Sequence, residues 1–240
     1  MDLLSSALLA LLVVGYLVLA GADIGLGMLM PRLARGPEQR RRVVAAVAPY
    51  FLASEVWLVA AFGVLAGLFP ALEHHVVAEL WPVLAVLLAG WLVRDAGLWL
   101  RARVDGDRWR LVCDCALVGG SWALAAAWGL VVAGLLAGGL TASAFTPLCA
   151  ALAAVLLAAL AATSGLVGPM LSRHTSAAAI AVPGLLVALA VPELPWAPIP
   201  STTAVFVWAT LVPVIPVMFV GQVWLYRMTR RPAVAPTFFA

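Results

Sequence analysis

Five ionisable residues lie within or beside long apolar stretches of the sequence, and they have the clearest capacity for chemistry. They are Asp23, Glu55, Arg94, Asp95 and Asp114. A charged group at the middle of a membrane-spanning helix costs about 2.5–3.5 kcal/mol on insertion scales, so it usually serves a function or is matched by a partner. Carboxyl groups at such a depth can carry protons, or they can make polar contacts with a neighbouring subunit.

Two interpretations of these five residues follow from the sequence. In the first, they form a proton path or a polar contact to a partner that carries a cofactor. In the second, they form ion pairs that lock helices together, such as Arg94 with Asp23 or with Asp114. We favour structural ion pairs for Arg94, Asp95 and Asp114. We favour function for Glu55, whose mid-membrane depth leaves it fewer partners, and both interpretations stay open for Asp23.

Small residues surround Asp23 in the stretch GADIGLGMLMP. Gly21 and Gly25 have the GxxxG spacing, and Gly27 follows, so these glycines predict close helix packing. In the second apolar stretch, Trp57 could line a cavity or fill the core. Tyr16 and Trp91 are more typical of bundle cores or membrane interfaces.

Histidine usage argues against a haem or a metal site on this chain. The three histidines are His74, His75 and His174. None lies deep in an apolar stretch, where a membrane cytochrome needs axial haem ligands. The sequence also lacks a phosphate-binding loop, a dinucleotide fingerprint and a CxxC pair. We therefore expect that this chain alone binds no haem and no metal.

The elements that must position these residues are membrane helices. The chain is 65% hydrophobic and 10% charged, with a mean hydropathy of +1.10, which excludes a soluble domain of 240 residues. We predict an all-α integral membrane protein, a single transmembrane domain over residues 1–240, with a polytopic bundle of about seven helices. The predicted helices span roughly 6–30, 44–69, 79–100, 111–136, 145–170, 177–192 and 202–226.

The arginines predict the orientation of this bundle. All fourteen basic residues are Arg, and none falls in the alternate connections around 70–78, 137–145 and 192–201. Connections rich in Lys and Arg stay on the cytoplasmic side. An odd number of helices then places the N-terminus outside and the C-terminus inside the cell. We expect a multi-pass protein of a bacterial plasma membrane that faces anionic lipid and binds no nucleic acid.

Three ordered motifs resemble subunit II of the cytochrome bd quinol oxidases. The first is GADIGLGMLMPRLAR, the second combines Pro49 with the stretch EVWL that starts at Glu55, and the third is RWR with Asp114. The closing QVWLYR is a weaker match. The resemblance covers most of the chain.

This resemblance implies a non-haem subunit of a quinol:dioxygen oxidoreductase of aerobic respiration. A partner, subunit I, would hold the b and d haems and the quinol site. The subunit would support this partner and shape oxygen and proton paths, with Trp57 lining the gas path. A structural quinone or lipid between the helices stays open.

The chain also differs from the family pattern at acidic positions. Ala20 and Leu52 stand where the family has acidic residues, and Ser54 stands where it has asparagine. Asp23 and Glu55 are then the deep acids that match the family. The alternative from another class is a small membrane transporter or a scaffold that has lost the oxidase role. A transporter would have broken helices in matched halves.

Overall fold

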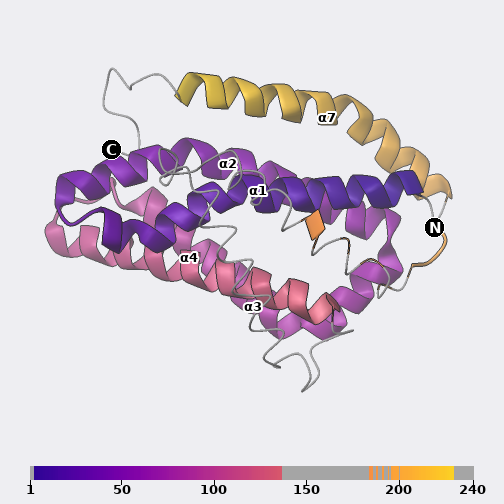
Figure 1. The fold of residues 1–240 in the computed structure, drawn as a ribbon, viewed down its shortest axis with the longest axis horizontal. Coiled ribbons are helices and arrows are strands. Elements are labelled where there is room, and N and C mark those ends of the chain that lie inside the picture. The colour runs from indigo at the N-terminus through magenta and orange to yellow at the C-terminus, as the bar shows by residue number, and fades with distance from the viewer. Residues whose placement is uncertain are drawn as a thin grey trace.

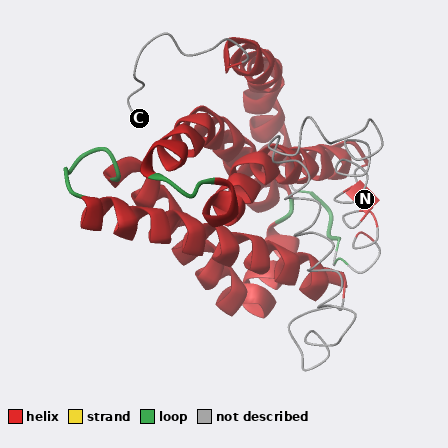
Figure 2. Ribbon diagram, turned by 60° about the vertical axis from the view of Figure 1, so that its left-hand side comes forward, coloured by secondary structure: helices red, strands yellow, loops and turns green. Residues whose placement is uncertain are grey.

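The computed structural model describes residues 3–136 and 201–229, together with a few positions between 184 and 199. In this part of the chain all regular structure is helical (Figures 1 and 2). The long helices are α1 (Leu3–Leu33), α2 (Pro37–Leu68), α3 (Pro70–Leu100), α4 (Asp107–Leu136) and α7 (Ser201–Thr229). The predicted helices 145–170 and 177–192 lie outside the described residues, apart from isolated positions of the second.

Length and composition allow four of the described helices to cross a membrane. The candidate spans are Leu3–Arg32, Pro70–Leu100, Asp107–Leu135 and Ser201–Leu225. A shorter apolar segment, Ala53–Leu68, lies in α2. The prediction of an all-α membrane protein is confirmed.

The boundary between α2 and α3 differs from the predicted one. Residues 70–78 were predicted to be a connection, but α3 begins at Pro70 and only Phe69 separates it from α2. Proline suits the first helical position because its missing N–H would have no helical partner there. The backbone of Phe69 leaves the helical region at φ −129° and ψ 58°, while its N–H still bonds the carbonyl oxygen of Leu65. The chain therefore turns within one residue.

Helices α3 and α4 form the closest pair, and α1 packs against both α2 and α4 (Figure 1). Glycines on α3 and α4 permit this approach. A Cβ atom on Gly120 would lie 2.6 Å from the backbone nitrogen of Arg94 and 2.6 Å from the carbonyl oxygen of Gly90. The long helix α7 lies along α2 at the edge of the bundle, with most of its side chains exposed.

All three glycines of α1 that were predicted to pack against other helices are buried, but a contact with a named neighbour is described for Gly27 alone. Gly21 and Gly25 are buried. Gly27 faces α4, where an added Cβ would meet the side chain of Ser121, whose own Cβ would be 2.9 Å away. Gly27 thus packs against α4. Close helix packing at Gly21 and Gly25 stays a prediction.

We expect Gly120→Ala to disrupt the α3–α4 pair. The added methyl group would press on the backbone of α3, which cannot move aside as a side chain can, and overpacking of this kind typically costs about 1–3 kcal/mol. Gly119→Ala is the matched control, because a methyl group added there would have no atom of another helix within 4 Å among the described residues. The yield of folded protein in detergent should fall for Gly120→Ala alone. Equal yields for the two variants would contradict this packing.

Candidate functional site

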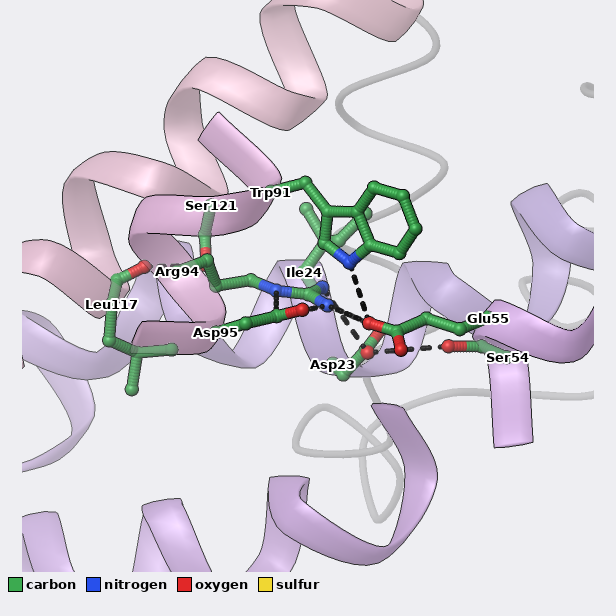
Figure 3. A network of polar contacts seen from close by, with 9 residues as sticks. All are labelled: Asp23, Ile24, Ser54, Glu55, Trp91, Arg94, Asp95, Leu117 and Ser121. Carbon is green, nitrogen blue, oxygen red and sulfur yellow. Dashed lines mark hydrogen bonds and ion pairs between the residues drawn. The ribbon is translucent and has the colours of Figure 1, made fainter. Parts of the chain in front are cut away.

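A buried arginine organises the candidate site. Arg94 lies on α3 and its side chain is 3% exposed. Its guanidinium nitrogens lie 3.3 Å from Asp23 Oδ2, 3.3 Å from Glu55 Oε1 and 2.9 Å from Asp95 Oδ1 (Figure 3). These carboxylates come from α1, α2 and α3, so Arg94 joins three helices. We call Asp23, Glu55, Arg94 and Asp95 the Arg94 cluster.

Asp23 is the most deeply buried acid of the cluster, with a side chain that is 0% exposed. Its Oδ2 accepts hydrogen bonds from Arg94 Nη1 at 3.3 Å and from Ser54 Oγ at 3.4 Å. Its Oδ1 accepts the backbone N–H of Ile24 at 3.0 Å. The predicted ion pair between Asp23 and Arg94 is therefore present. Both oxygens of the carboxylate are satisfied within the bundle.

Glu55 has a partner on each side of one carboxylate oxygen. Trp91 Nε1 donates a hydrogen bond to Glu55 Oε1 at 2.6 Å, and Arg94 Nη2 donates to the same atom at 3.3 Å (Figure 3). Depth was expected to leave Glu55 fewer partners, and in the structure α3 presents both Trp91 and Arg94 to it. The Glu55 side chain is still 16% exposed, and that of Asp95 is 20% exposed.

The Arg94 cluster contains more acidic than basic groups. Among the described residues, three carboxyl groups surround one guanidinium group. A single cation can balance only one carboxylate, and an uncompensated charge is expensive away from water. Carboxyl groups in excess of the available cation favour a protonated member, because neighbouring like charges disfavour one another. The cluster can therefore hold three helices together, and its excess carboxyl groups could also bind a proton.

Asp114 belongs to a second ion-pair group, nearer one end of the bundle. Its Oδ1 lies 2.6 Å from Arg101 Nε, and its Oδ2 lies 3.3 Å from Arg40 Nη1. The suggested alternative pair of Arg94 with Asp114 is not among the described contacts. Asp114 instead ties the start of α4 to the start of α2 and the end of α3.

Trp57 is a buried residue of α2 in the described structure. It is 4% exposed, and its ring meets Phe219 of α7 edge to face with 5.0 Å between ring centroids. Gly15 of α1 lies against the other part of the indole. This contact joins α7 to the rest of the bundle.

An apolar cavity of about 550 Å³ is lined by residues of α1, α2, α3 and α4 together with Val191, Leu194 and Trp196. Tyr16 and Trp91 line it, and so does Trp128, whose indole Nε1 is buried without a hydrogen-bond partner among the described residues. Tyr16 and Trp128 pack together with 5.2 Å between ring centroids. Trp57 is not among the described lining residues.

Sequence reasoning missed three members of this region: Ser54, Trp91 and Trp128. Trp91 precedes Arg94 by three residues, so the two share one face of α3, and this spacing could have predicted that they act on the same partner. The roles of Ser54 and Trp128 depend on how α2 and α4 are rotated in the bundle. No local pattern in the sequence reports that rotation.

Comparisons with known proteins agree with the sequence motifs. The family model of cytochrome bd terminal oxidase subunit II matches residues 1–240. The chain is 29% identical over 131 residues to the cytochrome bd-I ubiquinol oxidase subunit 2 of Escherichia coli strain K12, covering 55% of this chain and 35% of the relative. The probable cytochrome oxidase subunit 2 of Haemophilus influenzae gives the same values.

A relative from Bacillus subtilis strain 168, a cytochrome bd ubiquinol oxidase subunit 2, is 29% identical over 114 residues, which cover 48% of this chain and 34% of the relative. The matched parts thus span about a third of the length of these curated relatives. The family model nevertheless covers the whole sequence, so the chain belongs to the cytochrome bd terminal oxidase subunit II family.

Proposed function

We propose that the chain is the non-haem membrane subunit of a cytochrome bd-type quinol:dioxygen oxidoreductase. The observation that carries this proposal is the family match over residues 1–240. A partner subunit would oxidise quinol and reduce dioxygen to water. This chain would cover one face of that partner within the bilayer and would shape the routes of protons and oxygen.

The b and d haems of the complex are assigned in this proposal to the partner. In the described part of the chain, no group of three or more His, Cys, Asp or Glu side chains could hold a metal ion. His74 and His75 lie in the first turns of α3, far along that helix from Arg94, and His74 is exposed.

The apolar cavity supports the proposal of a structural quinone or lipid between the helices. The buried Nε1 of Trp128 lacks an acceptor among the described residues, and leaving such a donor unpaired costs about 1–3 kcal/mol. A carbonyl oxygen on an apolar ligand would supply that acceptor. The proposed gas path at Trp57 rests on the resemblance of its motif, and the cavity lies beside other residues.

Within this function, Asp23 and Glu55 are the proposed residues of a proton path or of a polar contact with the partner. Arg94 and Asp95 hold these acids in place, and Asp114 acts in the separate ion-pair group. The excess of carboxyl groups over cations in the Arg94 cluster supports this division.

We propose that the arginine-rich end of the bundle faces the cytoplasm, with the N-terminus outside. The arginine distribution supports this orientation. Single cysteines introduced as Leu140→Cys and Asp105→Cys, in a chain without its native cysteines, would test it. We expect an impermeant reagent added to intact cells to label position 140 and not position 105. The opposite pattern would reverse the orientation.

Affinity purification of the full chain from its native membrane tests the proposed function. We expect a haem-bearing subunit to co-purify and to give an intense Soret band together with quinol-dependent oxygen consumption. The chain expressed without that partner should show no stoichiometric Soret band, because it lacks deep histidines. Purification in good yield with no haem-bearing partner would contradict the proposal.

A further inference from the structure

The cavity and the Arg94 cluster are neighbours along the bundle axis. On α1, α2 and α3, every described lining residue of the cavity lies on one side of the cluster residue of the same helix. The lining residues precede Asp23 on α1 and Arg94 on α3, and they follow Glu55 on α2. On α3 they extend from Leu72 to Trp91, roughly 28 Å of helical rise. The cavity thus runs from the end of the bundle near Phe69 down to the cluster.

Trp91 stands at the boundary between these two regions. Its ring lines the cavity, and its Nε1 donates a hydrogen bond to Glu55 Oε1 at 2.6 Å. Glu55, Asp23 and Arg94 are not among the described lining residues. Figure 3 shows the indole beside Glu55, with its nitrogen directed at the carboxylate. Tyr16 and Leu58 complete the wall on α1 and α2.

We infer that Trp91 is a seal that separates the Arg94 cluster from the apolar cavity and so makes proton exchange at Glu55 one-sided. The ring closes off the cavity side of the cluster, and the indole N–H fixes Glu55 towards Arg94. This inference rests on the proposed function, in which Glu55 exchanges protons. Trp91 acts through Glu55, so it is a positioning residue.

The side from which Glu55 would exchange protons follows from the exposure of the neighbouring side chains. Towards the arginine-rich end, Leu98 and Leu117 are buried in an apolar cluster with Leu26 of α1. Asp23 and Arg94 are enclosed, with side-chain exposures of 0% and 3%. Only Glu55 and Asp95 keep 16% and 20% exposure among the cluster residues. Proton exchange is therefore directed to the edge of the bundle where these two carboxyls emerge.

Passive proton leak through the reconstituted complex tests the seal. Proteoliposomes with an entrapped pH-sensitive dye would receive a potassium diffusion potential in the absence of quinol. We expect Trp91→Ala to raise the initial proton flux several-fold above wild type, since it opens the cavity to Glu55. Trp91→Phe keeps the ring and should stay near the wild-type rate. Trp81→Ala is the matched control, because Trp81 lies on the same helix, is 65% exposed and is not among the lining residues.

A double variant links the leak to Glu55. Adding Glu55→Leu to Trp91→Ala should return the flux towards the wild-type rate, since the exchanging carboxyl is gone. A wild-type flux in Trp91→Ala, or a leak that persists in the double variant, would overturn the seal. If Trp91→Ala does not assemble, Trp91→Leu takes its place and should give a smaller increase, with a wild-type flux again overturning the inference. The leak is measured without turnover, so it tests the seal alone. The proposed role of Glu55 in turnover is tested independently, and normal oxidase rates in Glu55 variants would refute it.

Discussion

Arg94→Leu is expected to prevent assembly of the complex. The substitution leaves three carboxyl groups, from α1, α2 and α3, around an apolar side chain where a buried cation had been. Removing one partner of a buried ion pair typically costs about 3–5 kcal/mol, because the remaining charge stays buried and unmatched. Since Arg94 contacts both Asp23 and Glu55, the loss should separate the helices. The yield of assembled complex after detergent extraction measures the effect.

Two further variants make this result specific. Arg94→Lys keeps the charge but lacks the planar fork that contacts several carboxylates at once, so we expect partial assembly. Arg35→Leu is the matched control: it removes an exposed arginine near the end of the bundle and should leave the yield unchanged. A wild-type yield for Arg94→Leu would show that the Arg94 cluster does not hold the helices together.

The helices were accessible from sequence because a bilayer requires long apolar segments whose backbone is hydrogen-bonded internally. Apolar stretches around Asp23, Arg94 and Asp114 therefore predicted α1, α3 and α4. The start of α3 could not be predicted from apolar length alone. Residues such as Glu73 and His74 are polar enough to indicate a loop, yet the helix includes them because Pro70 can begin a helix immediately after Phe69.

The site was only partly predictable, for a geometric reason. The cost of buried charge identified Asp23, Glu55 and Arg94 as residues that need partners, and the pair of Asp23 with Arg94 was one of the suggested outcomes. The shared contact of Glu55 with Trp91 and Arg94 depends on the relative rotation and depth of α2 and α3. Hydropathy and motif spacing specify neither quantity, and for the same reason they could not choose between Asp23 and Asp114 as the partner of Arg94.

Glu55 is expected to be the acid with the largest effect on turnover. Glu55→Gln keeps the shape and can still accept the hydrogen bond from Trp91, but it removes the titratable group. A side chain that transfers a proton contributes about 10²–10⁴-fold to its step, so we expect turnover to fall by about a hundredfold if that step limits the rate. Glu55→Leu also removes the contacts with Trp91 and Arg94, so it should lower the assembled yield as well.

Oxygen consumption per assembled complex, with proton uptake recorded in the same sample, is the most direct test of a functional Arg94 cluster. Assembled complex would be quantified by the haem content that co-purifies with the chain, which separates a defect in turnover from a defect in stability. The predicted result is a Glu55→Gln variant that assembles at nearly wild-type yield and consumes oxygen slowly, with reduced proton uptake. Wild-type oxygen consumption and proton uptake in both Glu55→Gln and Glu55→Leu, at normal yield, would contradict the account and leave Glu55 with a packing role only.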